Sequence, residues 1–352
     1  MVMTTPSFRV GILGATGAVG QKFITLLENH PWFTITALAA SERSAGKRYA
    51  DAVRWTGEGL IPQAVRDLIV QPCEPNLECD FVFSGLDSSV AGEVEGAYAS
   101  AGYPVISNAR NYRMHPTVPL LIPEVNPDHV ALIPLQKPTF GPGFIVTNPN
   151  CSTVGLVCAL KPIHNAFGVK EVLVSTMQAI SGAGYPGIPS LDILGNVVPY
   201  IGGEEEKLEI EPPKLLGTLS ATGIDPAPIT TSAHCNRVPV IDGHTACVSV
   251  SLNTPASPEE VSAVLRSFPL PEDVVGLPSA PDALIEVHTA PDAPQPRRHV
   301  SLGGGQKVSV GRVRTCNLLD LRFVVLSHNT VRGAAGGALL NAELLVRRGY
   351  IR

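Results

Sequence analysis

The chain has 352 residues, a formal net charge of −5 and 44% hydrophobic residues, and its 33 glycines and 32 prolines indicate many loops. This length and apolar content predict a soluble α/β protein of two domains. The acidic balance, with no basic run to offset it, argues against nucleic-acid or anionic-membrane partners, and no apolar stretch approaches the roughly 18 residues of a membrane span.

The N-terminus, Met1–Pro6, lacks a basic segment followed by an apolar core, so we expect no signal peptide. The seven cysteines are an odd number and form no pair of C-x-x-C clusters. This pattern favours a reducing, cytoplasmic compartment over a disulfide framework, and it predicts no metal site.

The first elements form a βαβ unit. Phe8–Leu13 is typical of a buried strand, Gly14–Gly20 turns out of it, and an amphipathic helix leads to a second strand at Phe33–Leu38. Glycines at such a turn let the backbone approach a pyrophosphate, whose charge lies at the helix N-terminus. The turn therefore predicts dinucleotide binding, through Gly14, Thr16, Gly17, Ala18 and Val19.

The segment after the second strand indicates which dinucleotide is bound. Hydroxyls at Ser41 and Ser44 with the guanidinium of Arg43 suit the 2′-phosphate of NADP(H). Glu42 leaves a 2′-hydroxyl, and hence NAD, as an alternative. A solvated polar loop is the other interpretation.

Further strands are expected at Asp80–Ser84 and Pro104–Ser107, around a helix near residues 91–101. This alternation predicts a doubly wound parallel sheet of Rossmann type, with Ser84 at a strand end assigned to the cofactor. Ligands gather at the carboxyl ends of such strands, so Arg113 in the next loop could face an anionic substrate. A solvated basic loop is the alternative.

The most informative segment is Thr147–Thr153, in which Cys151 follows a Pro-Asn pair and precedes an apolar, helix-like run. A thiol at a helix N-terminus is stabilised as thiolate by the helix dipole and the unpaired amides. Most cysteines on apolar helices are small core residues, so this segment alone leaves both interpretations open.

Two later segments carry further candidates. The strand-like run Val172–Gln178 leads into a glycine loop, Ser181–Gly184, that could approach a nicotinamide or the thiol. The segment Cys235–Thr245 predicts a strand ending in Pro-Val, a tight Asp-Gly turn and a rigidly held His244 opening the next strand. An imidazole beside an activated cysteine is a natural proton shuttle, although a single histidine is more often structural.

Glu204–Glu209 predicts the acidic first turn of a helix. A solvated face is the usual explanation of such a run. Glu204 and Lys207 nevertheless share one helix face and could present both charges to a zwitterionic ligand.

Taken in this order, Gly14–Gly20, Asn150–Thr153, Gln178–Gly184 and Arg237–His244 resemble aspartate-semialdehyde dehydrogenase, most closely the branch found in fungi and archaea. The resemblance runs from about residue 8 to the C-terminus. It implies Cys151 as the acyl-forming nucleophile, His244 as the acid/base and Gln178 as the residue that orients the acyl group.

The same resemblance implies the substrate and cofactor contacts. Arg237 would bind the substrate α-carboxylate, and Glu204, or Glu205 if the alignment slips by one, would bind the α-amino group. The remaining implied substrate residues are Lys207 and Arg113, on phosphate, and Asn150. Ser181, Gly182 and Asn329 would lie at the nicotinamide, and the family's assembly implies a homodimer or homotetramer.

The resemblance also orders the domains. We expect residues 1–150 and 329–352 to form the NADP-binding domain, and residues 151–328 an α+β catalytic and dimerisation domain. Ser257–Glu260 predicts a capping box that opens a helix, and Leu270–Val300, rich in proline, is expected to be irregular. Lys307–Val313 and Leu318–Leu326 are expected as strands of a sheet at the subunit interface.

The predicted activity is NADPH-dependent reduction of L-aspartyl-4-phosphate to aspartate semialdehyde through a cysteine thioester, in the biosynthesis of threonine, methionine and related amino acids. Three alternatives remain at this point. The chain could reduce an acyl-CoA such as malonyl-CoA, it could be an N-acetylglutamyl-phosphate reductase, or it could be a catalytically silent NADP sensor.

Overall fold

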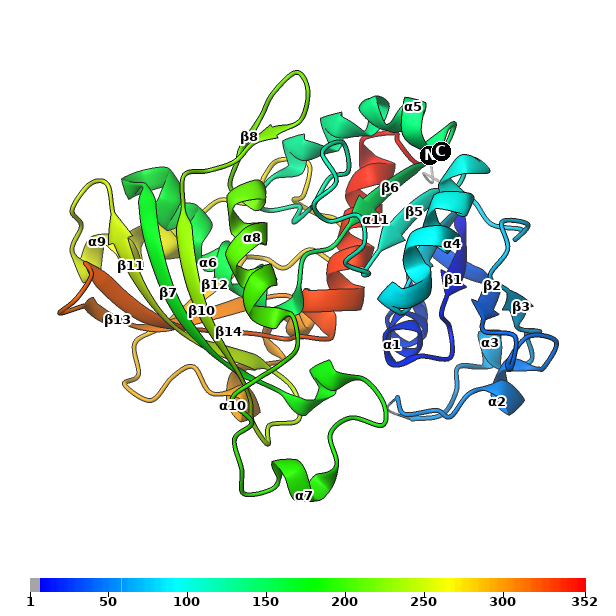
Figure 1. Cartoon of the computed structure of the whole chain (residues 1–352), viewed down its shortest axis with the longest axis horizontal. Helices are drawn as coiled ribbons and strands as arrows, with labels where there is room; N and C mark the ends of the chain where they lie inside the picture. Colours follow the sequence, from blue (N-terminus) through cyan, green and yellow to red (C-terminus); the bar gives the residue numbers. More distant parts are fainter. Residues whose placement is uncertain (1–6, 58) are drawn as a thin grey trace, which may run out of the picture. The chain divides into compact units, whose positions relative to one another are not determined.

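The computed structural model describes residues 7–57 and 59–352, and the chain divides into two compact units (Figure 1). The first contains the described residues up to Leu121, together with His129–Asn148 and Ala338–Arg352; the second contains Ile122–Asp128 and Pro149–Gly337. The chain therefore returns to the first unit at Ala338, whereas the sequence analysis placed this return at residue 329. The segment Met1–Pro6, expected to carry no signal peptide, lies outside the described residues.

The first unit is built on a sheet of six parallel strands in the order β3-β2-β1-β4-β5-β6. The strands are β1 (Phe8–Leu13), β2 (Phe33–Ala40), β3 (Gln71–Pro72), β4 (Phe81–Ser84), β5 (Pro104–Ser107) and β6 (Phe144–Thr147). Strands covered on both faces are apolar along their length, and Val10, Ile12 and Leu13 are fully buried. The strand order reverses between β1 and β4, which confirms the doubly wound fold predicted from the sequence.

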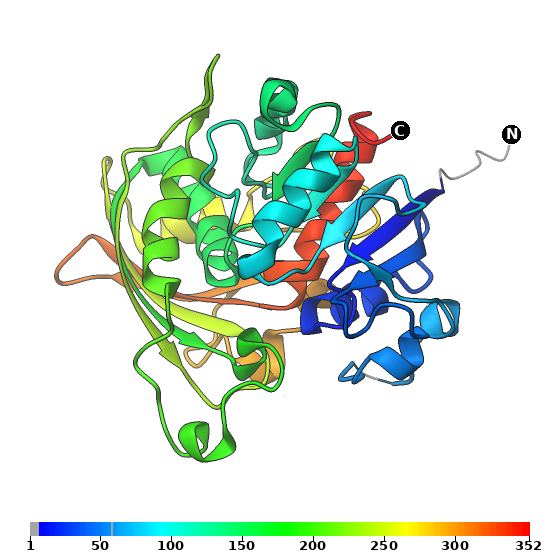
Figure 2. The ribbon, with the colours of Figure 1, turned by 45° about the vertical axis from the view of Figure 1, so that its right-hand side comes forward.

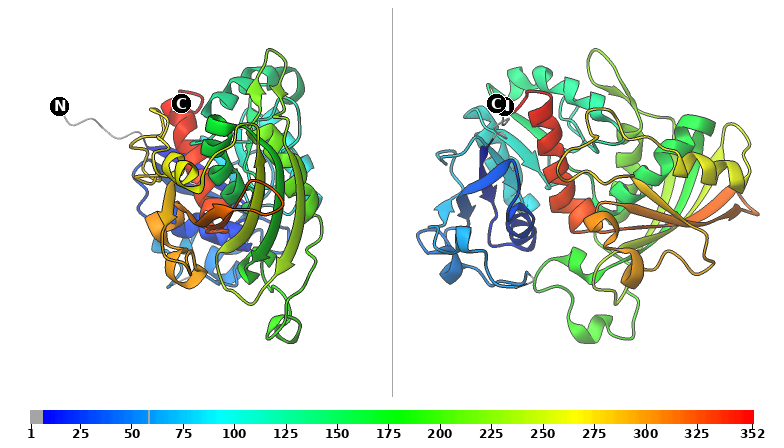
Figure 3. Two further views of the ribbon diagram at one scale, coloured as in Figure 1. Left: turned by 90° about the vertical axis from the view of Figure 1, so that its left-hand side faces the viewer. Right: turned by 180° about the vertical axis from the view of Figure 1, so that it is seen from behind.

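The helices of this unit are α1 (Ala18–Leu27), α2 (Tyr49–Ala52), α3 (Gln63–Arg66), α4 (Ser88–Ser100), α5 (Lys137–Phe140) and α11 (Gly336–Arg347), with a 3-10 helix η1 (Pro127–Gln136). In Figure 2, α4 (cyan) runs alongside the strands. In the right-hand view of Figure 3, α11 (red) lies against the same sheet. Two buried contacts hold α11 there, from His30 Nε2 to Glu343 Oε1 (3.0 Å) and from Asn341 Nδ2 to Asn148 Oδ1 (2.6 Å).

The second unit contains a mixed sheet in the order β10-β7-β11-β14-β13-β12. Its strands are β7 (Val169–Gln178), β10 (Thr230–Arg237), β11 (His244–Leu252), β12 (Ile285–His288), β13 (Val308–Thr315) and β14 (Leu321–Ser327), and β8 (Thr218–Leu219) pairs with β9 (Ile224–Asp225) apart from it. Helix α6 (Cys151–Phe167) packs against the mixed sheet and against α9 (Pro258–Arg266). The capping box predicted at Ser257 and Glu260 opens α9.

The remaining helices of this unit are short except for α8 (Glu204–Leu215), which lies beside β10. The short helices are η2 (Ile180–Ala183), α7 (Ser190–Ile193), α10 (Pro296–His299), η3 (Leu302–Gly305) and η4 (Val331–Ala335). The last of them, η4, has π-helical hydrogen bonding. The loop that carries α7 extends away from the sheet in Figures 1 and 2.

Two sequence predictions for this unit are wrong. The strand expected to end in Pro-Val is β10, which ends earlier, at Arg237; β7 lies between it and β11, although His244 does open β11 as expected. Leu270–Val300 is not wholly irregular, because Ile285–His288 pairs in parallel with β13. Both errors have one physical cause, which is that pairing partners distant in sequence decide which segments become strands.

The acidic run at the start of α8 covers an exposed sheet edge. β10 is an edge strand, and Glu205 Oε1 and Glu209 Oε1 accept hydrogen bonds from the backbone N–H groups of Cys235 (3.0 Å) and Ala233 (3.2 Å). Edge strands with unsatisfied amides invite pairing with other chains, so these carboxylates protect the edge. The solvated-face interpretation is therefore wrong for Glu205 and Glu209.

Across residues 7–57 and 59–352, no helix is both long and apolar enough to cross a membrane. Within the same residues, no cluster of three or more histidine, cysteine or acidic side chains is arranged to hold a metal ion.

Candidate active site

Cys151 is the first residue of α6, as the sequence predicted. Asn150 caps the helix, since its Oδ1 accepts hydrogen bonds from the backbone N–H groups of Ser152 (2.9 Å) and Thr153 (3.3 Å). The helix is 17 residues long, so the positive end of its dipole lies at the thiol. This location stabilises a thiolate at Cys151.

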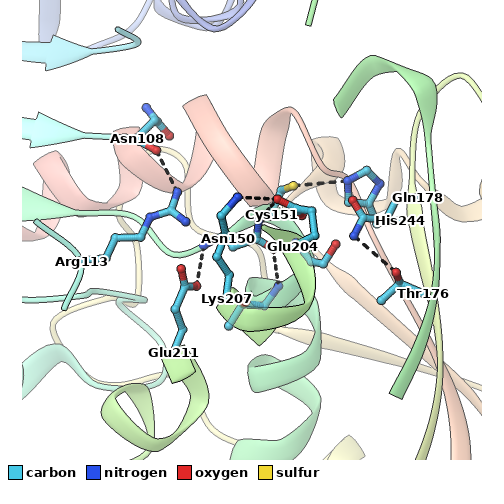
Figure 4. Close-up of polar contacts among 12 residues, drawn as sticks. Asn108, Arg113, Asn150, Cys151, Thr176, Gln178, Glu204, Lys207, Glu211 and His244 are labelled. Atoms are coloured by element: carbon cyan, nitrogen blue, oxygen red, sulfur yellow. Dashed lines mark hydrogen bonds and ion pairs between the residues drawn. The ribbon is translucent and has the colours of Figure 1, made fainter. Parts of the chain in front are cut away.

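His244 lies directly beside this thiol. Its Nε2 is 3.3 Å from Cys151 Sγ (Figure 4). Its Nδ1 accepts a hydrogen bond from the backbone N–H of Ala179 at 3.0 Å. The side chain is buried, with 4% of its surface exposed. Burial, followed by the nearby charge of Arg237, lowers the pKa of His244 to about 3, so its imidazole is neutral at physiological pH.

The strand order explains how distant residues meet here. β10 and β7 are parallel and pair Arg237 with Gln178, while β11 runs antiparallel to β7 and pairs Thr245 with Met177. The ends of β10 and β7 and the start of β11 consequently lie at one edge of the sheet, which brings together Arg237, Gln178 and His244.

The polar groups at this edge hold one another in place. Arg237 Nη1 donates to the carbonyl oxygen of Ala179 at 2.7 Å, and Gln178 Nε2 donates to Thr176 Oγ1 at 3.3 Å. Burial lowers the pKa of the Arg237 guanidinium, since only 5% of the residue is exposed. A buried cation at this position favours an anionic ligand, such as a carboxylate.

The glycine loop after β7 lies against the same residues. A Cβ atom at Gly182 would be 2.9 Å from Arg237 Nη1 and 3.1 Å from His244 Nε2. Asn329 fixes this loop, since its Nδ2 donates to Ser181 Oγ at 2.8 Å and its Oδ1 accepts from the backbone N–H of Gly243 at 2.9 Å. The predicted residues Ser181, Gly182 and Asn329 thus adjoin the Cys–His pair.

We expect Gly182→Ala to lower kcat strongly, because the new methyl group cannot be accommodated without displacing His244 or Arg237. Removing one positioned hydrogen-bond donor from an active site reduces kcat by about 10²–10³-fold, and we expect a loss of this size here. Steady-state kinetics of the variant measures the loss. Gly202→Ala is the matched control, since its Cβ would meet only Tyr200 Oη, at 3.7 Å; equal rates for the two variants would contradict the prediction.

Helix α8 contributes a charged pair to the site. Asn150 Nδ2 donates to both carboxylate oxygens of Glu204 (3.0 and 2.8 Å), and Lys207 Nζ lies 2.7 Å from Glu204 Oε1. Burial opposes ionisation of Glu204, but the charge of Lys207 and the hydrogen bonds from Lys207 and Asn150 outweigh it and lower the pKa of Glu204. Glu205 is engaged with β10 instead, which favours Glu204 as the ligand-binding carboxylate.

Sequence reasoning missed Glu211. This carboxylate is 1% exposed, and its Oε2 accepts a hydrogen bond from the backbone N–H of Asn150 at 2.8 Å. Glu204, Lys207 and Glu211 occupy one face of α8, and that helical spacing was the available signal. Together, Glu211 and Glu204 hold the residue that precedes the nucleophile through its backbone and its side chain.

The first unit holds the residues of the glycine turn and of the loop after β2 that were predicted to bind the dinucleotide. At Gly14 the backbone φ is +75°, and a Cβ there would be 2.8 Å from the carbonyl oxygen of Gly85. Gly17 is the N-cap of α1 and supplies no side-chain hydrogen bond to the first amides, which leaves that turn able to receive a phosphate. After β2, Ser41 and Arg43 are exposed and Ser44 is buried. This geometry fits a dinucleotide phosphate.

Arg113 lies in the loop after β5, in the first unit. It is 8% exposed, and its Nη2 donates to the carbonyl oxygen of Asn108 at 2.8 Å. The solvated-loop interpretation is therefore wrong for this arginine.

A buried carboxyl lies beneath the same loop. Glu95 on α4 is fully buried and accepts a hydrogen bond from Ser107 Oγ at 2.7 Å, while Ser107 Oγ accepts from the backbone N–H of Ala109 at 3.0 Å. Burial raises the pKa of Glu95 to about 7, although the hydrogen bond from Ser107 and the charge of Arg113 act in the opposite direction.

We expect this group to reduce stability as pH rises. The folded state binds the Glu95 proton more tightly than the unfolded chain, so stability present below about pH 4.5 is lost as pH rises through 7. The difference in free energy of unfolding between Glu95→Gln and wild type should therefore shift in favour of the variant by about 3 kcal/mol from pH 5 to pH 8. Urea unfolding at both pH values measures this gain, and exposed Glu93→Gln on the same helix is the control. A gain independent of pH would contradict the prediction.

Comparison with known proteins identifies both halves of the chain. Residues 9–133 match the family model described as semialdehyde dehydrogenase, NAD binding domain. Residues 160–332 match the model described as semialdehyde dehydrogenase, dimerisation domain.

Individual relatives agree along nearly the whole length. The aspartate-semialdehyde dehydrogenase of Cryptococcus neoformans is 50% identical over 99% of both chains, and that of Archaeoglobus fulgidus is 51% identical over 98% of this chain and 99% of the relative. The crystal structure of the Candida albicans aspartate-semialdehyde dehydrogenase with NADP is 47% identical and has a TM-score of 0.90, covering 98% of this chain and 100% of that one. This chain belongs to the aspartate-semialdehyde dehydrogenase family.

Proposed function

We propose that this protein reduces L-aspartyl-4-phosphate to L-aspartate 4-semialdehyde with NADPH, releasing phosphate, in the biosynthesis of threonine, methionine and related amino acids. The observation that carries the proposal is the Cys151 thiol at the N-terminus of α6, 3.3 Å from His244 Nε2. The relatives described above all bear the name aspartate-semialdehyde dehydrogenase, so the acyl-CoA reductase, the acetylated-substrate reductase and the silent sensor are not favoured.

Cys151 provides the covalent step. Its thiolate attacks the acyl carbon, a C–S bond forms, and the C–O bond to phosphate breaks, with the electron pair leaving on phosphate. Once the resulting thioester has been reduced, the C–S bond breaks and the aldehyde leaves as the thiolate re-forms. His244 acts on the oxyanion that develops at the same carbon in both steps.

The charged residues are proposed to recognise the two ends of the substrate. Arg237 binds the α-carboxylate and Glu204 the α-amino group, while Gln178 orients the acyl group and Asn150 keeps Glu204 in place. Lys207 and Arg113 bind the phosphate and stabilise its negative charge as it leaves.

The nucleotide is proposed to bind at the glycine turn of the first unit. When bound, NADPH supplies the hydride that reduces the thioester. Ser41, Arg43 and Ser44 would select the 2′-phosphate, and the other residues assigned to the cofactor are Gly14, Thr16, Gly17, Ala18, Val19, Ser84, Ser181, Gly182 and Asn329.

The test is oxidation of aspartate semialdehyde by the purified protein with each nucleotide in turn. We expect the rate to depend on inorganic phosphate and NADP to be preferred over NAD. A rate that is independent of phosphate would overturn the acyl-phosphate assignment. A rate that instead requires coenzyme A would support the acyl-CoA alternative.

We also propose a homodimer or homotetramer in the cytoplasm. One face of the mixed sheet exposes alternate residues of four strands, including Leu173, Cys247 and Arg322, and we assign this face to the subunit interface. All seven cysteines are in the described part of the chain and none forms a disulfide, which is compatible with a reducing compartment. Light scattering of the purified protein measures the mass, and a monomeric mass would contradict the assembly proposed.

A further inference from the structure

A single peptide unit in the loop after β5 is hydrogen-bonded on both sides. The backbone N–H of Ala109 donates to Ser107 Oγ at 3.0 Å. The carbonyl of the same peptide unit, which belongs to Asn108, accepts from Arg113 Nη2 at 2.8 Å (Figure 4). A trans peptide is planar, and its N–H and C=O point in opposite directions, so whatever fixes the N–H also fixes the carbonyl. The orientation of this peptide therefore decides where Arg113 finds its acceptor.

The chain of hydrogen bonds ends at a buried carboxyl. Ser107 Oγ, which accepts the N–H of Ala109, donates its own proton to Glu95 Oε1 at 2.7 Å. Every bond thus runs in one direction, from the guanidinium of Arg113 through the peptide and the hydroxyl to the carboxyl. A cation at the donor end and a carboxyl at the acceptor end polarise such a chain cooperatively. Without the carboxyl, the hydroxyl proton turns elsewhere and the N–H of Ala109 loses its fixed partner.

Burial isolates this chain from solvent. Glu95 and Ser107 are 0% exposed, and Arg113 is 8% exposed. Burial raises the pKa of Glu95 and the charge of Arg113 acts in the opposite direction, so the two ends of the chain attract each other. Water cannot replace a lost partner at such a place, and each contact therefore matters more than it would at the surface.

One face of α4 holds the remainder of the loop. The carbonyl oxygen of Ser88 accepts from Asn111 Nδ2 at 3.0 Å. The carbonyl oxygen of Gly92 accepts from Tyr112 Oη at 2.6 Å. Positions 88, 92 and 95 are at helical spacing and lie along one side of α4. At the first two positions the helix offers a backbone carbonyl, which every residue type has, whereas at the third it offers the side chain of Glu95.

We propose that Glu95 is a positioning residue for Arg113. Through Ser107 and the peptide that follows Asn108, it sets the direction of the guanidinium that binds the phosphate. This inference rests on the proposed function, in which Arg113 binds phosphate. Glu95 does not touch the substrate, because it is fully buried. Its loss consequently weakens the binding of phosphate and leaves the binding of aspartate semialdehyde and of the nucleotide unchanged.

Three variants test this in the oxidation of aspartate semialdehyde at varied inorganic phosphate. Glu95→Met fills the same space but has no carboxyl, Ser107→Ala removes the linking hydroxyl, and Glu95→Gln keeps an acceptor oxygen in place. We expect the first two to raise KM for phosphate by about 10–100-fold, with the other two KM values within about twofold of wild type. Glu95→Gln should match wild type. Ser107→Ala provides the answer if Glu95→Met fails to fold.

A double-mutant cycle shows whether the effect passes through Arg113. In an Arg113→Ala background, we expect Ser107→Ala to leave kcat/KM for phosphate unchanged, because the group that it positions is absent. A purely structural role would instead raise every KM and would add to the loss in Arg113→Ala. The matched control is Glu93→Gln, an exposed carboxylate on the same helix, which should keep wild-type constants.

The outcomes separate this inference from the proposed function. A wild-type rate that is independent of phosphate would overturn the proposed function and this inference with it. A phosphate-dependent wild type whose Ser107→Ala variant keeps the wild-type KM for phosphate would overturn this inference alone. Additive losses in the double-mutant cycle, or a Glu95→Gln variant as impaired as Glu95→Met, would do the same.

Discussion

Cys151→Ala is expected to lower the rate of aldehyde formation by at least about 10⁴-fold, because without the thiol there is no thioester to accept hydride. NADPH binding should be retained, since the substitution leaves the glycine turn at Gly14–Gly20 unaltered. Initial rates in both directions measure the first result, and nucleotide fluorescence titration measures the second. Appreciable turnover in this variant would contradict the covalent mechanism.

The matched control is Cys316→Ala, which removes a half-buried thiol just after β13 in the same unit. We expect its rate to equal that of wild type. Cys151→Ser adds a second comparison, since it keeps the cap geometry of α6 but replaces the thiolate with a hydroxyl that is far less ionised. A serine variant as slow as the alanine variant would show that the rate depends on the ionised sulfur and not on the shape of the site.

The parts of this fold that could be predicted from the sequence are those set by local chemistry. The strand at Phe8–Leu13, the glycine turn and the helix after it follow from periodicity and backbone freedom within about 20 residues. The same is true of the Asn150 cap, whose side-chain oxygen accepts from the backbone N–H groups of Ser152 and Thr153, and of the capping box at Ser257. In each case the groups that decide the structure are close in sequence.

The parts that could not be predicted depend on pairing between distant segments. Nothing in Cys235–Thr245 indicates that β7, from about 60 residues earlier, separates Arg237 from His244. The decisive partner of His244 is likewise a backbone N–H, at Ala179, which no residue type reveals. The resemblance implied His244 as a catalytic residue, and the structure adds the neighbours of both its ring nitrogens, Ala179 N–H and Cys151 Sγ.

Glu124 and Arg332 illustrate the same limit, because they are 208 residues apart and form a bidentate pair inside the second unit. The distances are 2.6 Å for Nη1 to Oε1 and 2.7 Å for Nη2 to Oε2, and the two side chains are 0–1% exposed. Arg332 Nη2 also lies 3.5 Å from Cys158 Sγ, two turns along α6 from Cys151. The next residue, Gly333, is so close to the nucleophile that a Cβ there would be 2.7 Å from Cys151 Cβ. This ion pair therefore fixes the segment at Arg332 and Gly333 that packs against Cys151.

Glu124→Ala should lower the free energy of unfolding by about 3–5 kcal/mol, since it leaves the Arg332 charge buried without its counter-ion. It should also slow alkylation of Cys151, because the Gly333 segment is no longer fixed. Replacing both partners, as Glu124→Leu with Arg332→Met, removes the charge as well as its partner and should cost less than the single change. Urea unfolding of wild type, Glu124→Ala, Glu124→Leu, Arg332→Met and the double variant measures this, with Asp292→Ala at an exposed ion pair as the control. A double variant as unstable as the sum of its two single variants would refute the anchoring role of the pair.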